Sequence, residues 1–246
     1  MNSALKERKI NKNIFNDTIT KDTIVIILDS VKDEQQQVLQ KKKISEFEQK
    51  LIDEGLVNIK DLDSTIVVDL RYSTENNFMK MDVYGDWENA YLQPDVAEKL
   101  VLAQHFLQLK HPNYKLIIFD AVRPVSVQQK MWETLDLPMK EKTKYLSPPK
   151  KGSLHNFGAA VDLSIVDEFG EELDMGTEFD FFGELAYPRK EIQLMKQGKI
   201  TPAQINNRQM LREVMRKAGW TNIETEWWHF NSVDWKEAKE RYDKVE

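Results

Sequence analysis

Two side chains that could bind one metal ion together lie in the segment 152–163, GSLHNFGAAVDL. It holds His155, one of four histidines, and the carboxylate of Asp162. Small residues between the two leave room for a tight turn, and the apolar run around Asp162 is typical of a buried strand. An imidazole just before a strand and a carboxylate on it can converge on one metal ion, and zinc accepts both ligand types.

A third ligand must come from elsewhere, because two ligands do not hold a catalytic zinc. The candidates are His105, His111 and His229. We favour His229 because it closes the aromatic stretch 224–230, and because Glu226 lies three residues before it. A carboxylate close in sequence to a ligand histidine is a recurring way of placing a general base beside a metal site. We interpret His105 and His111, on or just after an expected helix, as structural or exposed.

Each of these residues taken singly also has an ordinary structural interpretation. A lone histidine in an apolar strand is often a satisfied core residue, and Asp162 could accept a hydrogen bond in a turn. Arg123 follows the apolar run 116–119 at a strand-to-helix corner, where it could serve a site or pair with Asp120. Asp180, between two phenylalanines, is either a cap or an anion in a partly apolar pocket. The combination of residues, rather than any one of them, favours a metal site.

Two motifs carry a resemblance to a known family. Ser153-x-His155-x-x-Gly158-x-Ala160-x-Asp162, followed by Glu226-Trp-Trp-His229, is similar to the zinc D-alanyl-D-alanine dipeptidases of the VanX type, within the zinc D,D-peptidase family. Further matching blocks occur in the same order: Asp69-Leu-Arg-Tyr72, Asp120-x-x-Arg123-Pro124, Met175-Gly-x-x-Phe-Asp180 and Asn207-Arg208-x-x-Leu-Arg212. The similarity spans about residues 61–230, and Val122 stands where the family often has tyrosine.

The resemblance and the residue types together predict a zinc hydrolase with one Zn2+ per chain. The expected ligands are His155, Asp162 and His229, a set that leaves one position of tetrahedral zinc open for water. The expected reaction is hydrolysis of D-alanyl-D-alanine, in cell-wall precursor turnover or glycopeptide resistance. Glu226 would move the proton, and Arg123 would share the negative charge that develops on the carbonyl oxygen.

The resemblance also implies how a small D,D-dipeptide is held. Asp180 and Tyr72 would bind its free ammonium, and Ser153 would lie near its other end. Such a contact would restrict the enzyme to free dipeptides, because a buried carboxylate without its cation is unfavourable. Two alternatives stay open: a zinc D,D-carboxypeptidase or endopeptidase acting on longer peptidoglycan peptides, and a hedgehog-like zinc domain without activity. Asp180 argues against the first, and an intact Glu226 argues against the second.

Strands in both halves of the chain, with helices between them, predict an α+β fold with a mainly antiparallel central sheet and flanking helices. The family fold implied by the resemblance is of that kind. We expect residues 1–60 to be an N-terminal, partly helical extension and residues 61–246 to be the dipeptidase domain. The expected helices cover 33–54, 94–110 and 202–217, and the expected strands begin at 66, 116, 160 and 223, the last ending at 230. A charged, solvated helix or tail should follow from 232 to 246.

Composition narrows the class of protein. Of 246 residues, 41% are hydrophobic and 31% charged, as in an ordinary globular protein. The net charge of −6 argues against nucleic-acid binding, and the absence of cysteine excludes disulfides and thiolate zinc ligands. The polar N-terminus lacks the apolar core of a signal peptide, and the run 23–28 is too short to span a bilayer. We therefore expect a cytoplasmic protein, or a periplasmic or exported one if a signal was removed.

Overall fold

The computed structural model describes residues 44–143 and 146–246. Residues Ser45–Glu246 form one compact unit. Of the helix predicted over residues 33–54, residues 33–43 lie outside the described part. The rest contains α2 (Glu46–Asp53), whose N-terminus Ser45 caps through a capping box with Glu48. The predicted functional division at residue 60 stays a prediction.

The core of the described unit is a five-stranded sheet with the order β2-β4-β5-β7-β6. Its strands are β2 (Val67–Val68), β4 (Lys115–Asp120), β5 (Ala160–Val166), β7 (His229–Asn231) and β6 (Thr221–Asn222). β2 runs parallel to β4, and the other neighbouring pairs are antiparallel. The predicted α+β fold with a mainly antiparallel sheet is therefore confirmed. A separate two-stranded sheet joins β1 (Val57–Asn58) to β3 (Tyr91–Leu92).

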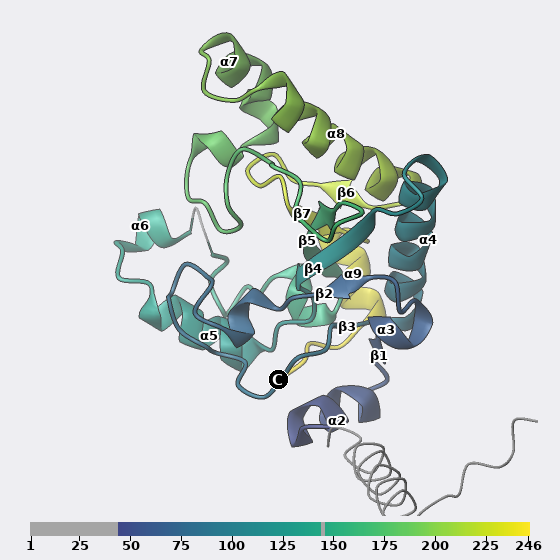
Figure 1. The fold of residues 1–246 in the computed structure, drawn as a ribbon. Helices are drawn as coiled ribbons and strands as arrows, with labels where there is room; N and C mark the ends of the chain where they lie inside the picture. Colours follow the sequence, from purple (N-terminus) through teal and green to yellow (C-terminus); the bar gives the residue numbers. More distant parts are fainter. Residues whose placement is uncertain (1–43, 144–145) are drawn as a thin grey trace, which may run out of the picture. The chain divides into compact units, whose positions relative to one another are not determined.

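Helices flank the sheet (Figure 1). They are α3 (Ile59–Leu62), α4 (Pro94–Lys110), α5 (Val125–Thr134), α6 (Met139–Lys142), α7 (Glu191–Lys196), α8 (Pro202–Lys217) and α9 (Trp235–Arg241). Short 3-10 turns are η1 (Arg71–Ser73), η2 (Leu154–Phe157), η3 (Glu184–Ala186) and η4 (Pro188–Lys190). The predicted helices 94–110 and 202–217 are confirmed as α4 and α8, and each begins with proline at its first position, where the missing N–H costs nothing. Within the described residues, no helix is long and apolar enough to cross a membrane.

The two central strands are buried almost throughout. Every residue of β5 is buried, and so is every residue of β4 after Lys115. Continuous apolar runs of this kind are typical of strands covered on both faces, and α4 packs against β4 while α8 packs against α4 and β6. A polar side chain on these strands must therefore have a partner, and Asp120 and Asp162 are two such residues.

The predicted strand over 223–230 is wrong for most of its length. Residues 221–222 and 229–231 form β6 and β7, and the pairs Thr221↔Asn231 and Asn222↔Phe230 close them into a hairpin. The residues between these strands must reverse the chain direction, so they cannot extend either strand. Trp227 and Trp228 are nevertheless buried, which is why the aromatic pattern resembles a core strand.

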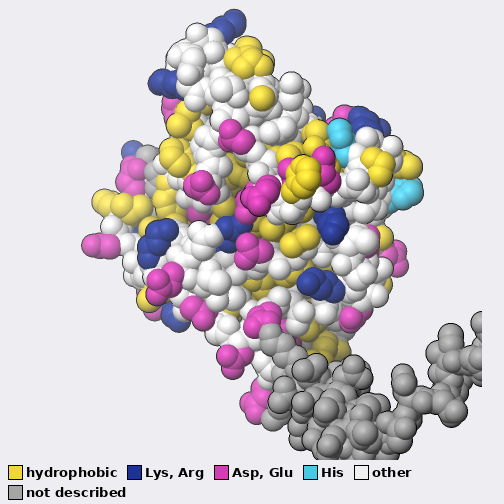
Figure 2. Space-filling view, in the orientation of Figure 1, with side chains coloured by type: hydrophobic (Ala, Val, Ile, Leu, Met, Phe, Trp, Pro, Cys, Tyr) yellow, Lys and Arg dark blue, Asp and Glu magenta, His cyan; other side chains and the backbone are white. Residues whose placement is uncertain are grey.

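The C-terminal segment is more than a solvated tail. Beyond α9, Val245 is buried, and its backbone N–H donates to the carbonyl oxygen of Asn156 at 2.8 Å. The tail therefore supports the turn that carries His155. Elsewhere on the face seen in Figure 2, Lys and Arg side chains are scattered among Asp and Glu side chains, the pattern of a solvent-exposed surface rather than of a single-sign field for a polyanion.

Candidate metal centre and active site

The register of the sheet places three polar side chains in one row. Asp120 on β4 pairs with Asp162 on β5, and Asp162 pairs with His229 on β7. Directly opposed residues on neighbouring antiparallel strands point to the same face with their Cβ atoms about 4.5–5.5 Å apart. The pairing alone therefore brings the two carboxylates and the imidazole together.

His155 reaches the same place from η2, just before β5. Gly158 ends this turn in the left-handed conformation with φ 61°, which a glycine adopts without strain. The turn is tied to the corner after β4, because the Arg123 N–H donates to the His155 carbonyl at 3.0 Å and the Asn156 amide donates to the Arg123 carbonyl at 2.7 Å. These bonds fix the ring of His155 over the strands.

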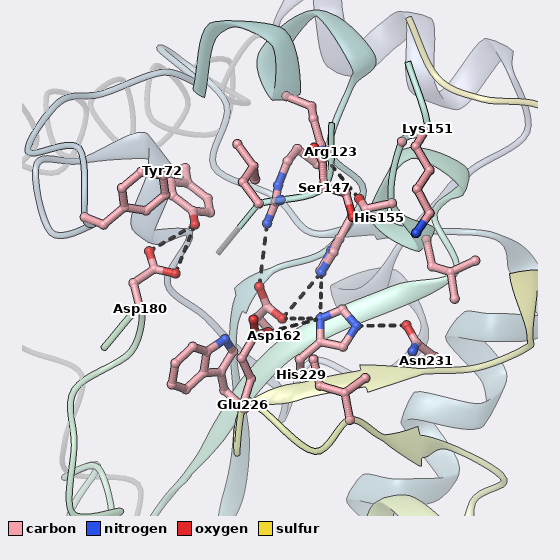
Figure 3. Close-up of a pocket in the computed structure, with 18 of the residues that line it drawn as sticks. Tyr72, Arg123, Ser147, Lys151, His155, Asp162, Asp180, Glu226, His229 and Asn231 are labelled. Atoms are coloured by element: carbon pink, nitrogen blue, oxygen red, sulfur yellow. Dashed lines mark hydrogen bonds and ion pairs between the residues drawn. The ribbon is translucent and has the colours of Figure 1, made fainter. Parts of the chain in front are cut away.

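His155, Asp162 and His229, the metal-binding triad, offer one ligand atom each within 4.8 Å of one another (Figure 3). Asp162 Oδ1 lies 2.9 Å from His229 Nδ1 and 3.4 Å from His155 Nε2. The two histidine nitrogens are 3.2 Å apart. His105 and His111, the other candidates, lie in α4 and at its C-terminal cap. The structure thus brings together the three predicted ligands, and metal binding itself stays a prediction.

In each of the two histidine rings, the nitrogen that points away from Asp162, called the outer nitrogen, lies beside a hydrogen-bond acceptor. His155 Nδ1 lies 2.7 Å from the carbonyl oxygen of Ala121, and His229 Nε2 lies 2.8 Å from Asn231 Oδ1. An acceptor at the outer nitrogen holds a proton there, so the inner nitrogen carries a lone pair. Two such lone pairs and the carboxylate of Asp162 face each other in a buried place. This donor set fits a zinc ion.

Charge in the triad is consistent with a cation site. Burial alone would raise the pKa of Asp162, but the rings of His155 and His229, when they are protonated in the absence of a metal, hold the pKa well below its ordinary value. Positive charge at this place therefore favours the carboxylate form of Asp162. A buried anion of this kind needs compensating positive charge.

Glu226 lies beside the triad, on the connection between β6 and β7. Its Oε2 atom is 4.0 Å from His229 Nδ1, and a quarter of the side chain (26%) remains exposed. Burial raises the pKa of Glu226 to about 7, and the nearby Asp162 and Asp180 act in the same direction against His229. A carboxyl that titrates near neutral pH can both accept and return a proton.

Arg123 both pairs with Asp120 and faces the site, which are the two roles considered for it from the sequence. Its Nε donates to Asp120 Oδ2 at 2.9 Å, and Tyr84 donates to the other oxygen of Asp120 at 2.6 Å. Its Nη2 also lies 3.7 Å from Asp162 Oδ2, so the guanidinium faces the triad. Burial opposes its charge, but Asp120, Tyr72, Tyr84 and Asp162 together outweigh burial, and the pKa of Arg123 lies above its ordinary value. The salt bridge thus positions a permanent cation at the site.

Asp180 and Tyr72 meet at another part of the same cavity. The Tyr72 hydroxyl donates to Asp180, with 3.0 and 3.2 Å to the two carboxylate oxygens. Burial raises the pKa of Asp180 to about 7, with Asp162 adding to the shift. Tyr72 packs edge-on against the rings of Phe78 and Phe179. Asp180 therefore lies in a partly apolar pocket, as one of its two interpretations predicted.

A cavity of about 410 Å3 connects all of these groups, a volume suited to a small ligand. The residues predicted for catalysis, metal and substrate all line it: Tyr72, Arg123, Ser153, His155, Asp162, Asp180, Glu226 and His229. The hydroxyl of Ser153 donates to Gln128 Oε1 at 3.2 Å. Its proton is therefore already used within the protein.

Comparison with known protein families agrees with this geometry. The family of peptidases described as D-ala-D-ala dipeptidase matches residues 53–246, well over half of the chain. The chain belongs to this family. It is a peptidase, and the zinc dependence of the family agrees with the donor set of the triad.

Similar proteins from three bacteria carry the same description. A D-alanyl-D-alanine dipeptidase of Escherichia coli (strain K12) is 29% identical over 175 residues, which is 71% of this chain and 83% of the relative. One of Synechocystis sp. is 26% identical, over 58% of this chain and 69% of the relative. One of Enterococcus faecalis is 26% identical, over 68% and 85% respectively.

Sequence reasoning missed several residues that contact the triad or Arg123. Asn231 follows His229 by two positions, and alternation along a strand places both side chains on one face, so a signal was present. Asp120 was considered only as a partner of Arg123, although a carboxylate ending an apolar strand is itself a signal. The carbonyl of Ala121 is a backbone group and has no sequence signal.

Proposed function

We propose that this chain hydrolyses D-alanyl-D-alanine to two molecules of D-alanine in a zinc-dependent reaction. The observation that carries the proposal is the placement of the triad, Glu226 and the Asp180–Tyr72 pair on the wall of one cavity. The relatives at 26–29% identity, all described as D-alanyl-D-alanine dipeptidases, support the same substrate. Turnover of cell-wall precursors or glycopeptide resistance is the role we propose.

One zinc ion per chain would be held by His155 Nε2, Asp162 Oδ1 and His229 Nδ1. When bound there, zinc supplies Lewis acidity and lowers the pKa of water toward about 7. The acceptors at the outer histidine nitrogens keep the inner nitrogens free for this purpose. The domain that carries the chemistry is proposed to be residues 61–246, and the cytoplasmic location stays a prediction.

Glu226 moves the proton. Its carboxylate accepts a proton from the attacking water as the oxygen of that water bonds to the peptide carbonyl carbon. It then returns the proton to the nitrogen of the departing D-alanine as the carbon–nitrogen bond breaks. A carboxyl whose pKa burial raises to about 7 suits both steps.

Arg123 stabilises the negative charge that develops on the carbonyl oxygen. Asp120 accepts from its Nε and Nη2 atoms, and Nη1 makes no hydrogen bond to any residue that the structure describes. A preorganised donor of this kind is commonly worth about 2.7–4 kcal/mol to the transition state. Because Asp120 holds the guanidinium beforehand, little reorganisation is needed during the reaction.

Asp180 and Tyr72 bind the substrate's ammonium, and Ser153 lies nearer its other end. The ammonium would restore full ionisation to Asp180, whose charge burial disfavours. A longer peptide places a neutral amide at this point, which leaves the carboxylate without a cation. This feature favours a dipeptidase over a carboxypeptidase or endopeptidase.

The test is release of D-alanine from D-alanyl-D-alanine by purified protein. We expect turnover that disappears when a chelator removes the metal and returns when one equivalent of zinc is added. A His155→Ala protein, prepared in parallel, should bind zinc weakly and release little D-alanine. Full turnover in the chelated protein would contradict the proposal.

A further inference from the structure

Lys151 lines the cavity on the side away from the Asp180–Tyr72 pair. Figure 3 shows Asp180 and Tyr72 on one side of the metal-binding triad, and Lys151 on the opposite side, above Asn231. Arg123 and the triad lie between these two ends. A ligand that spans the triad therefore meets a carboxylate at one end and an ammonium at the other.

The charge of Lys151 is free to act on a ligand. The other permanent cation on the cavity wall, Arg123, is already paired with Asp120. Lys151 forms no ion pair with any carboxylate among residues 44–143 and 146–246, and its side chain is exposed. The lining carboxylates Asp162, Asp180 and Glu226 all lie at or beyond the triad.

The backbone of Lys151 is nevertheless held in place. Its N–H donates to the Pro148 carbonyl at 2.9 Å, and its carbonyl accepts from Lys244 Nζ at 3.2 Å. Gly152, with φ 80°, leads directly into the His155 turn, and a Cβ there would lie 2.8 Å from Asn156 Oδ1. The side chain therefore projects from an ordered turn, not from a free loop.

Size and chemistry match a free dipeptide. Two residues span at most about 7 Å when extended, so the ends of a dipeptide cut at the triad stay within this cavity. The hydroxyl of Ser153 already donates to Gln128. The C-terminal carboxylate of the dipeptide therefore needs another hydrogen-bond donor. Building on the proposed function, we propose that Lys151 binds the C-terminal carboxylate of the substrate and makes the enzyme select peptides with a free carboxyl end.

The experiment compares D-alanyl-D-alanine with D-alanyl-D-alanine amide, which lacks the negative charge. In the wild type we expect kcat/KM to favour the free acid by about 10- to 100-fold, because a hydrogen bond to a charged group contributes about 1.5–3 kcal/mol. Lys151→Gln should remove most of this preference through a higher KM for the free acid, with kcat and the rate on the amide nearly unchanged. Lys151→Arg should restore it.

Lys150→Gln is the matched control, since it removes the same charge one position away, from a residue outside the cavity lining. It should keep the wild-type preference. An unchanged preference in Lys151→Gln, an equal loss in Lys150→Gln, or no preference in the wild type would each overturn the inference.

Calorimetry separates this inference from the proposed function. Binding of the acid and the amide to a Glu226→Gln protein, and to the same protein with Lys151→Gln, gives the preference without turnover. A binding preference that depends on Lys151, together with a wild-type protein that hydrolyses neither compound, would support the inference and contradict the dipeptidase proposal. Equal binding of acid and amide, or binding of neither, would overturn the inference whatever the activity.

Discussion

Glu226 Oε2 lies 4.0 Å from His229 Nδ1, the nitrogen that faces the metal-binding triad. Glu226 is not one of the three residues whose ligand atoms all lie within 4.8 Å of one another. It is therefore close enough to exchange a proton beside the metal and is not needed to hold it. Proton transfer and metal binding should be separable by mutation.

Glu226→Gln should lower kcat by about 10²–10⁴-fold, because the amide cannot accept the proton. Zinc content, measured on the same sample, should remain near one per chain. Glu224→Gln is the control, since Glu224 lies on the same connection with a largely exposed side chain, and its activity should match the wild type. Loss of zinc from the Glu226 variant would place this carboxylate among the ligands.

Asn231→Ala should weaken zinc binding by about 10- to 100-fold, because it removes the acceptor that orients His229. Competition with a chromogenic chelator measures this affinity directly. Asn231→Asp keeps an acceptor oxygen at the same place and should retain most of the affinity. Equal zinc affinity in the alanine variant and the wild type would show that Asn231 does not position the ring.

Asp180→Asn should stabilise the metal-free protein at high pH. The pKa of Asp180 is about 7 in the folded protein, against an ordinary value of 3.8, so folding takes up a proton between these values. The destabilising contribution of Asp180 is therefore absent below about pH 4, grows from pH 4 to 7, and is complete above pH 7, at most about 4 kcal/mol. Asparagine tolerates the φ of 58° found here.

Denaturant unfolding of wild type and Asp180→Asn, in chelator at pH 4.5 and pH 8, measures this difference. We expect the variant to gain much more stability over the wild type at pH 8 than at pH 4.5. Glu226 titrates in both proteins, and because Asp180 helps to raise its pKa, the difference between them contains this coupling as well as the titration of Asp180 itself. A gain of the same size at both pH values would mean that Asp180 is not held protonated by the fold.

Gly158→Ala should destabilise the protein more than Gly170→Ala, although both glycines have positive φ. The left-handed conformation costs each alanine about 1–2 kcal/mol. A Cβ on Gly158 would also lie 3.1 Å from Leu56 Cδ2, whereas nothing lies within 4 Å of one on Gly170, and such crowding adds about 1–3 kcal/mol. Thermal unfolding of the two variants measures the difference, and equal losses would show that Leu56 can move aside.

The parts of the fold and site that could be predicted from sequence have strong local signals. Apolar continuity marks β4 and β5, and the proline starts mark α4 and α8. The three residues of the triad stand out because histidine is scarce in this chain and two of the three come from one short motif. Their convergence then follows from the pairing of Asp162 with His229 across the sheet.

The remainder depends on contacts that local patterns do not encode. The aromatic run before His229 resembles a strand because its tryptophans are buried, although the backbone there is not an extended strand. Only the pairing of β6 with β7 shows that the chain turns at this point. The position of Asp180 against Tyr72 depends on a left-handed residue in an irregular segment. The proximity of the Val245 backbone to Asn156 joins residues far apart in sequence, which a single sequence cannot reveal.

The central claim is that the enzyme acts on free dipeptides because Asp180 binds the substrate's ammonium group. Its most direct test is kcat/KM for D-alanyl-D-alanine against N-acetyl-D-alanyl-D-alanine, with zinc-loaded protein. Acetylation removes the charge and leaves the half-buried carboxylate alone, at a cost of up to about 3–5 kcal/mol, so the free dipeptide should be favoured by about two orders of magnitude or more. Asp180→Ala should narrow this ratio. Equal rates on the two substrates in the wild type would contradict the dipeptidase account and favour a carboxypeptidase.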